Sequence, residues 1–207
     1  MSHPWQEMPL AVYEEHMSQV AQLQLLNQIM KSQWQAYPQA ESAVALGVAG
    51  GNGLEYCGSL KTVYGVDINP DYLQECRRRF GPDMGPRLKL VQMDLSAEEA
   101  EWPKADLLLA DLLIEYVGIK HFCQKAAQSQ AAYISCVIQS ASTGQGFVSE
   151  SPQQAQFAKI GKLHHDVDPD ILCTELAKYK FVLVLHEAFP LPDGKCFLRF
   201  DFRRTIL

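Results

Sequence analysis

The stretch that decides the fold is ALGVAGGNGLEYC, residues 45–57, in which four glycines lie within seven positions after an apolar run. A buried strand, a glycine-rich turn and a helix start bring backbone N–H groups together, and such a point attracts an anion or a carboxylate. Glycines also let a ligand approach the backbone, because no Cβ is in the way. The stretch therefore predicts a ligand-binding loop, followed by a helix over about 53–60.

Two familiar nucleotide-binding loops do not fit this stretch. A dinucleotide-binding loop needs G-x-G-x-x-G, but Tyr56 stands at the third glycine position when the motif is read from Gly51. Read from Gly50, the motif fails at Asn52. No G-K-[ST] follows, so the phosphate-binding loop of nucleoside triphosphatases is excluded as well.

Beyond the loop, short apolar runs alternate with helical segments. The runs are SAVALGV (42–48), TVYGVD (62–67), RLKLVQM (87–93), ADLLLAD (105–111) and AAYISCVIQ (131–139). Continuous apolar runs of this length are typical of parallel strands that helices cover on both faces. The intervening segments predict helices over 70–80, 118–129 and 169–179, and a short acidic helix after residue 93.

Two further apolar runs, 180–189 and 195–204, flank the turn sequence PLPDG and predict a C-terminal β-hairpin. The fold class is therefore α/β, with a doubly wound seven-stranded sheet made of five parallel strands plus the hairpin. The segment from Ser140 to Ser151, rich in Ser, Gly and Gln, is expected to be a mobile loop.

The N-terminal region predicts one or two amphipathic helices over 7–36. Their apolar stripe, at steps of three and four, consists of Tyr13, Met17, Val20, Leu23, Leu26, Met30 and Trp34. We expect an N-terminal helical lid or extension over 1–40 and one further domain over 41–207. The stripe would pack on that domain or on a second copy, which would make a homodimer.

Composition narrows the class of protein. The formal net charge is −6, which does not favour binding to a phosphate backbone, so nucleic acid is an unlikely partner. None of the six cysteines is spaced as C-x-x-C, which indicates free thiols in a reducing compartment. No signal peptide and no apolar run of about 18 residues is visible, so we expect a cytoplasmic protein without a membrane partner.

From about residue 43 onward, the chain resembles the class I S-adenosylmethionine-dependent methyltransferases. Gly51-Asn52-Gly53 matches the end of that family's glycine motif, and VYGVDINPDYL matches its second motif. LVQMDL and ADLLLAD resemble the third and fourth motifs, in the family's order. The resemblance implies a Rossmann-like fold, S-adenosylmethionine as cofactor and methyl transfer as the activity.

The resemblance also implies roles for individual residues. Asp67 would hold the ribose hydroxyls, Asp94 or its neighbours would contact the adenine, and Asp111 would face cofactor and substrate. The alternatives are structural: Asp67 as a cap for the helix at Pro70, and Asp94 as the acid that opens a helix. The complete set of candidate cofactor-binding residues is Gly47, Ala49, Gly51, Asn52, Gly53, Asp67, Ile68, Asp94, Leu95 and Asp111.

The chain departs from the family pattern at two positions. Gly47 stands where the family usually has an acidic residue, and Ala49 stands where it has its first glycine. The acid helps to hold the cofactor's amino group in that family. Glu55 and Asp111 are both candidates to replace it, and the sequence does not choose between them.

Catalytic residues are harder to assign, because an activated methyl group needs alignment more than acid–base help. Candidates for a base are Glu115, Tyr116 and His121 near the sheet edge, with Tyr13 and His16 in the lid; for each, packing is the alternative. The cluster of His164, His165, Asp166 and Asp168 suggests a metal site, but a polar loop that caps the next helix is preferred, so no metal is expected.

The sequence thus predicts an S-adenosylmethionine-dependent methyltransferase that acts on a small-molecule acceptor. One alternative is a methyltransferase for protein or RNA, with contacts from the N-terminal helix. The other is a non-catalytic module of the same fold, and the missing acid at Gly47 is its best support.

Overall fold

The computed structural model describes residues 3–141 and 146–205. Its core is one seven-stranded sheet in the order β3-β2-β1-β4-β5-β7-β6. The first five strands in sequence are parallel, and the last two form an antiparallel hairpin that pairs with β5 through β7, which confirms the predicted fold class. The strands are β1 (Ser42–Leu46), β2 (Thr62–Asp67), β3 (Leu88–Gln92), β4 (Leu107–Asp111), β5 (Tyr133–Ser140), β6 (Phe181–Pro190) and β7 (Cys196–Arg204).

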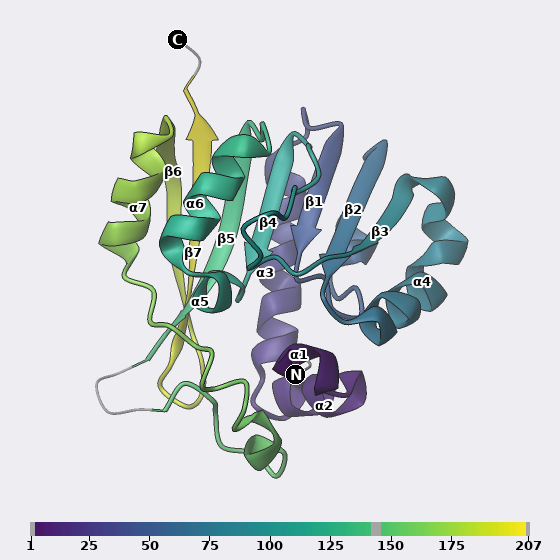
Figure 1. Cartoon of the computed structure of the whole chain (residues 1–207), viewed down its shortest axis with the longest axis vertical. Helices are drawn as coiled ribbons and strands as arrows, with labels where there is room; N and C mark the ends of the chain where they lie inside the picture. The colour runs from purple at the N-terminus through teal and green to yellow at the C-terminus, as the bar shows by residue number, and fades with distance from the viewer. Residues whose placement is uncertain (1–2, 142–145, 206–207) are drawn as a thin grey trace.

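Helices cover both faces of the sheet, as Figure 1 shows. The core on one face contains apolar residues of α3 (Gln22–Ala36) and α4 (Pro70–Met84), packed on Ala43 and Ala45 of β1. The core on the other face joins α6 (Ile119–Gln128) and α7 (Pro169–Lys178) to the alternate residues of the same strands. Alternation of this kind is what a sheet buried on both faces requires.

The N-terminal helices α1 (Pro4–Glu7) and α2 (Leu10–Gln19) lie at the carboxyl end of the parallel strands (Figure 1). The chain then turns at Ala21, whose φ is 61°, and enters α3. A third apolar cluster joins this region to the segment after β5: Met8, Phe157 and Ile160 are buried there, with Trp5 and Tyr13 packed against them. Together α1, α2 and η3 (Gln154–Phe157) form a cap over the sheet edge.

Two predicted helices do not form. Instead of a helix over 53–60 there is only the 3-10 turn η1 (Leu54–Tyr56), because α3 already covers this face of β1 and Met30 packs directly on Gly53. The expected acidic helix after β3 is replaced by turns. Lys125 there donates to the carbonyl oxygens of Glu98 and Ala100, the latter at 2.9 Å, so these carbonyls bind an ammonium group instead of helical N–H groups.

The other predicted helices, over 70–80, 118–129 and 169–179, are confirmed as α4, α6 and α7 within a few residues. Two short elements complete the chain, η2 (Gly85–Arg87) and α5 (Ile114–Val117). Of the loop expected over 140–151, residues 142–145 lie outside the described part. Among the helices of that part, none is long and apolar enough to cross a bilayer.

Candidate functional site

The register of the sheet aligns the predicted site residues along one edge. Leu46 of β1 lies between Val66 of β2 and Ala110 of β4. The next residue along each strand is Gly47, Asp67 or Asp111, so these three stand side by side. This is the edge outside the carboxyl ends of parallel strands, where ligands bind in open α/β sheets.

A cavity of about 100 Å³ opens at this edge, between the strand ends and the cap. We call it the first cavity. It brings together most of the predicted cofactor residues with aromatic side chains of the cap and with loops after β3 and β4. Its lining includes Gly47, Ala49, Asp67, Ile68, Asp94, Leu95 and Asp111, together with His3, Trp5, Tyr13, Tyr72, Met93, Ser96, Leu112, Leu113, Tyr116 and Val117.

Asp67 is fixed at the rim of this cavity by backbone donors. Its Oδ2 accepts from the Ala49 N–H and its Oδ1 from the Asn69 N–H, each at 2.9 Å. Burial raises the pKa of this carboxyl group, while the same backbone bonds work in the opposite direction. Each carboxylate oxygen keeps a further lone pair, so Asp67 can still accept hydrogen bonds from a diol.

The glycine loop is shaped mainly by the helices that pack on it. A Cβ on Gly51, where φ is +93°, would lie 2.6 Å from the Phe80 ring, and one on Gly53 would lie 2.7 Å from the sulfur of Met30. A Cβ on Gly50 would meet Glu14 and Leu10 of α2. Gly47 and Ala49 of the loop line the first cavity, whereas the backbones of Gly51 and Gly53 lie against the side chains of Phe80 and Met30.

A second, smaller cavity of about 40 Å³ adjoins the first under α2 and α3. The two share Tyr13, Gly47, Ala49 and Asp111 as lining residues. The rest of the second cavity is largely apolar, with Leu23, Leu26, Met30, Ala45, Leu46, Val48 and Leu109, and its further polar linings are Glu14, Gly50 and Asn52.

Asp111 lies between these two cavities with one oxygen unpaired. Its Oδ1 accepts from Gln33 Nε2 at 2.8 Å, whereas its Oδ2 is buried without a partner among the described residues. Burial raises the pKa of this carboxyl group to about 7. An unsatisfied buried polar atom costs about 1–3 kcal/mol, and a ligand that supplies the missing donor recovers that free energy.

A third cavity, of about 50 Å³, lies on the other side of Tyr13 and Tyr116. It shares Trp5, Tyr13, Leu112 and Tyr116 with the first cavity. Its remaining lining is aromatic, apolar or uncharged and polar: His16, Met17, Gln22, Gln139, Phe147, Val148, Ser149 and Phe157. Tyr13 therefore stands where all three cavities meet.

His16 is the predicted base that the structure places in the third cavity with a suitable protonation state. It is buried, and its Nδ1 lies 2.7 Å from Ser151 Oγ. Burial, with a contribution from Lys195, lowers the pKa of the imidazole, so the ring is neutral at pH 7 and able to accept a proton. Burial raises the pKa of the Tyr13 and Tyr116 phenols, which disqualifies both as bases at neutral pH.

Glu115 and His121 lie outside the residues that line the three cavities. The Glu115 side chain is fully buried, and its Oε1 accepts from the Gln139 N–H at 2.8 Å. His121 Nε2 is 2.9 Å from the Leu95 carbonyl oxygen, next to the turn that replaces the acidic helix. Both residues thus hold backbone next to the site, Glu115 at the end of β5 and His121 in the turn after β3.

The remaining predicted polar residues have structural partners. Asp94 Oδ1 accepts from the N–H and hydroxyl of Ser96, which closes a turn. Asp168 caps α7 through the N–H groups of Asp170 and Ile171. His164 stacks on Phe147, and within the described ranges no three His, Cys, Asp or Glu side chains converge as metal ligands would.

Sequence reasoning missed Asn69, which joins the cap to the sheet. Its Oδ1 accepts from Asp71 N–H and so begins α4, while its Nδ2 donates to the carbonyl oxygens of Trp5 and Met8. The sequence NPD is typical of a helix cap. Nothing local indicates the second task, because the carbonyls come from more than 60 residues away.

Neither the family models nor the curated protein sequences that were compared contain a match to this chain. Solved structures do match its fold. The N-methyltransferase NodS from Bradyrhizobium japonicum WM9, in complex with S-adenosyl-L-homocysteine, has a TM-score of 0.65 at 14% identity over 88% of this chain and 87% of its own. Magnesium protoporphyrin IX methyltransferase (ChlM) from Synechocystis PCC 6803, with bound S-adenosylmethionine, has a TM-score of 0.62 at 10% identity over 88% and 79%.

The methyltransferase domain of bacterial CtHen1-C has a TM-score of 0.64 at 15% identity over 88% of this chain and all of its own. Identities this low establish the fold and nothing finer. The chain therefore has the fold of the class I S-adenosylmethionine-dependent methyltransferases.

Proposed function

We propose that this chain binds S-adenosylmethionine in the first and second cavities and transfers its methyl group to a small acceptor. One observation carries the proposal: Gly47, Asp67, Asp94 and Asp111, predicted from separate motifs, line one cavity at the carboxyl edge of a methyltransferase-type sheet. Two of the similar structures named above, ChlM and NodS, hold this cofactor or its product, which supports the same assignment here.

The third cavity is our candidate for the acceptor site. It adjoins the first cavity through Tyr13 and Tyr116, and it lies beneath the cap rather than on an open surface. Among its lining residues none is Asp, Glu, Lys or Arg, and most are aromatic or aliphatic. This chemistry favours an uncharged, largely apolar molecule with a hydroxyl or amine group, and it disfavours a protein or RNA chain as acceptor.

The reaction needs few groups from the protein. A lone pair on the acceptor attacks the methyl carbon, the carbon–sulfur bond breaks, and its electron pair stays on sulfur, which gives S-adenosylhomocysteine. The acceptor then loses one proton, and we assign its removal to His16. Tyr13, at the junction of the cavities, would face the reacting sulfonium with its ring, a favourable contact for a cation.

Thermal unfolding tests the cofactor assignment first. Wild type and Asp67→Asn would be heated with S-adenosylmethionine, S-adenosylhomocysteine, NAD or ATP. A ligand at 100 times its dissociation constant stabilises by about 2.7 kcal/mol, which raises the midpoint by roughly 5–10 °C at this size. We expect a shift with the first two ligands, and a smaller one in the variant. If the midpoint of the wild-type protein does not change with either of these two ligands, the proposal is overturned.

The acceptor is tested by formation of S-adenosylhomocysteine with a panel of phenols and aromatic amines, each paired with a carboxylated analogue. We expect turnover of uncharged compounds only. His16→Gln should lower kcat on a phenol by about 100-fold, the usual worth of a general base. Cofactor binding without turnover of any panel member would instead favour a non-catalytic module, and turnover of RNA or protein would refute the small-molecule assignment.

A further inference from the structure

Unpaired buried atoms gather around the second cavity. Asp111 Oδ2 and Gln33 Oε1 are acceptors without partners among the described residues, and Asn52 Nδ2 is a donor without one. Asp111 and Asn52 line the cavity, and Gln33 is bonded to Asp111 at 2.8 Å. Buried polar atoms are nearly always paired in native proteins, so such a set indicates a ligand that completes it.

The missing partner has a definite chemistry. Two acceptors, one of them a carboxylate, call for a cationic donor, and the amide donor calls for an anionic acceptor. A cation and an anion a few bonds apart on a short aliphatic chain describe an α-amino acid group, and the apolar part of the lining, such as Leu26 and Met30, suits that chain. The end of S-adenosylmethionine that bears its ammonium and carboxylate groups has this composition.

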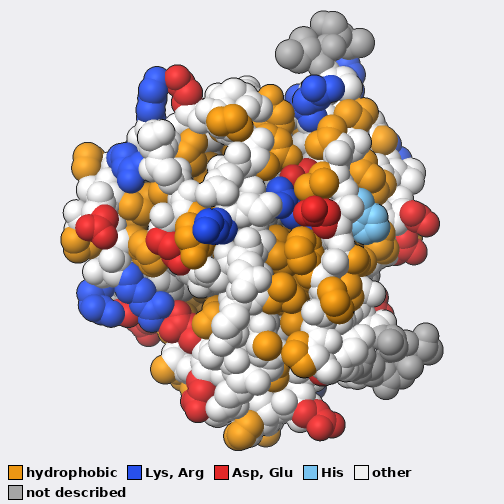
Figure 2. All heavy atoms as spheres, turned by 180° about the vertical axis from the view of Figure 1, so that it is seen from behind, with side chains coloured by type: hydrophobic (Ala, Val, Ile, Leu, Met, Phe, Trp, Pro, Cys, Tyr) orange, Lys and Arg blue, Asp and Glu red, His pale blue; other side chains and the backbone are white. Residues whose placement is uncertain are grey.

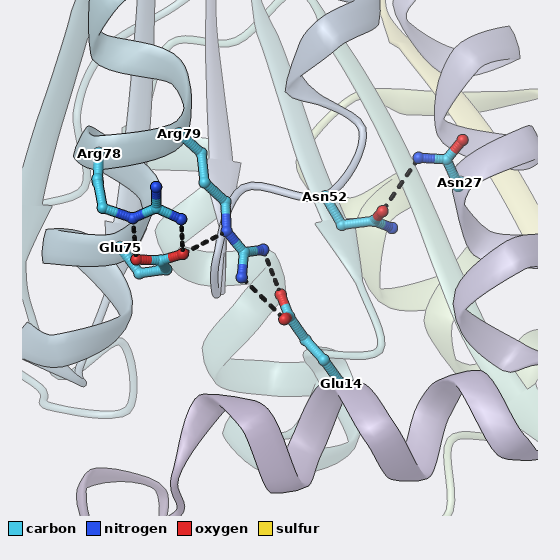
Figure 3. A network of polar contacts seen from close by, with 6 residues as sticks. All are labelled: Glu14, Asn27, Asn52, Glu75, Arg78 and Arg79. Carbon is cyan, nitrogen blue, oxygen red and sulfur yellow. Dashed lines mark hydrogen bonds and ion pairs between the residues drawn. The ribbon is translucent and has the colours of Figure 1, made fainter.

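Two other acidic residues near the loop, Glu55 and Glu14, already have side-chain hydrogen-bond partners. Glu55 is exposed, and its Oε1 accepts from Asn27 Nδ2 at 2.9 Å. Glu14 lines the second cavity, but both of its oxygens bind the Arg79 guanidinium at 2.5 and 2.9 Å (Figure 3). In Asn52 the oxygen is taken by Asn27 at 3.0 Å, while its nitrogen carries no contact in Figure 3.

We propose that Asp111, oriented by Gln33, holds the ammonium group of the cofactor, and that Asn52 donates to the cofactor's carboxylate. The inference rests on the proposed function, because it assigns part of the same cofactor site. It gives Asp111 the task left open by Gly47, and it rules out Glu55 for that task. It also makes α3, which precedes the first strand, part of the cofactor site.

The decisive experiment compares two ligands. S-adenosylhomocysteine and 5′-methylthioadenosine share the adenosine and thioether groups, but only the first has the amino acid end. Calorimetric titration of Asp111→Asn should show at least tenfold weaker binding of S-adenosylhomocysteine and unchanged binding of methylthioadenosine. Glu55→Gln, the matched control, should bind both ligands as wild type does. Normal methylthioadenosine binding also shows that each variant is folded.

A pH series on the wild-type protein provides a second measurement. Burial raises the pKa of Asp111 to about 7, so the carboxylate that binds an ammonium is progressively lost below that pH. We expect the affinity ratio of the two ligands to fall roughly tenfold from pH 7.5 to 6.0, and to stay flat in Asp111→Asn. The charged and titratable groups that act on Asp111 from the surrounding elements are Tyr13, Glu115, Cys136, Arg199 and Asp201.

The outcomes separate the two proposals. If wild type binds neither ligand, the proposed function fails and this inference fails with it. If wild type binds both ligands and Asp111→Asn loses neither, the cofactor assignment stands and the inference is overturned. If Glu55→Gln, and not Asp111→Asn, binds S-adenosylhomocysteine more weakly, the ammonium group is assigned to Glu55.

Discussion

The guanidinium group of Arg79 on α4 donates to both carboxylate oxygens of Glu14 on α2, with nitrogen–oxygen distances of 2.5 and 2.9 Å (Figure 3). The pair is partly buried and crosses directly over Gly50, whose missing Cβ leaves room for it. Arg79 is held in turn by Glu75 of its own helix at 2.7 Å. The pair therefore fastens the cap to the domain beside the candidate cofactor site.

Glu14→Gln should loosen the cap. We expect a loss of about 1 kcal/mol in the free energy of unfolding, the scale of a partly exposed ion pair, and faster hydrogen exchange in α2. Binding of S-adenosylhomocysteine and methylthioadenosine should weaken to the same extent, since the cap closes over both. Lys61→Gln, which breaks the exposed pair with Glu41, is the control and should change neither exchange nor binding. Unaltered exchange in α2 would mean that the pair does not hold the cap.

Gly51→Ala should destabilise the protein severely. The backbone there has φ +93°, and the added methyl group would overlap the Phe80 ring and the Cys76 sulfur. Strain and overpacking together predict a loss of about 2–4 kcal/mol in urea unfolding. Gly81→Ala, inside α4 with ordinary φ and room for a methyl group, should be neutral or stabilising by up to about 1 kcal/mol. Equal effects at the two positions would contradict this account of the loop.

Tyr13, at the junction of the cavities, should contribute to cofactor binding through its ring and not through its hydroxyl group. It stacks on Tyr72 with a centroid distance of 6.3 Å and meets Trp5 edge-on at 5.8 Å. Tyr13→Phe keeps these contacts and should bind S-adenosylhomocysteine within about twofold of wild type, whereas Tyr13→Ala should bind about tenfold more weakly, a change of 1.4 kcal/mol. A tenfold loss in Tyr13→Phe would show that the hydroxyl, and not the ring, is required.

Glu115→Gln should change how stability depends on pH. Burial raises the pKa of Glu115 to about 7, so the native carboxyl holds its proton at pH values where the unfolded one has lost it. The contribution of Glu115 to native stability therefore falls as the pH rises from about 5 to 8, and a glutamine removes that fall. Relative to wild type, the variant should gain roughly 2–3 kcal/mol over this range in urea unfolding. Glu98→Gln is the control, because that side chain is 85% exposed, and its stability should follow that of wild type at every pH. If the difference in stability between Glu115→Gln and wild type does not change with pH, the raised pKa of Glu115 is refuted.

The strands could be predicted from the sequence because each buried run carries its own signal. AAYISCVIQ and ADLLLAD are largely apolar, and the PLPDG turn marks the hairpin. Parallel connections then place Asp67, Asp94 and Asp111 at the same edge of the sheet, because the carboxyl ends of parallel strands meet there. For this reason most of the first cavity could be predicted without coordinates.

The packing around the glycine loop could not be predicted in the same way. Gly51 and Gly53 look like places for a ligand, but their partners, Phe80 and Met30, come from helices that no local pattern brings to the loop. The role of Gln33 could not be predicted for the same reason, because it contacts Asp111 only where α3 packs under the end of β4. Lys125 likewise abolishes the acidic helix from a distance. In each case a contact between segments far apart in the chain decides the local structure.

The exposed side chains of the edge strand show one further limit of sequence patterns. Val182, Leu183 and Val184 of the edge strand β6 are 40–50% exposed, although the run looks as apolar as the buried strands. Figure 2, which shows the molecule from behind, has apolar side chains in patches with charged side chains scattered between them. Apolar composition predicted a strand there, but not which strand lies at the edge of the sheet.

The cap also determines when the site comes into being as the protein folds. Its helices are made first, yet they rest on Asn69, Tyr116 and Phe157, which are made much later. We expect these contacts to open before the sheet does when the native state fluctuates, because the cap joins the domain through fewer buried residues. A chain whose sheet is complete but whose cap is still open would have a stable fold and an unfinished pocket. For this protein, we therefore expect readiness to bind to be lost before the fold is lost.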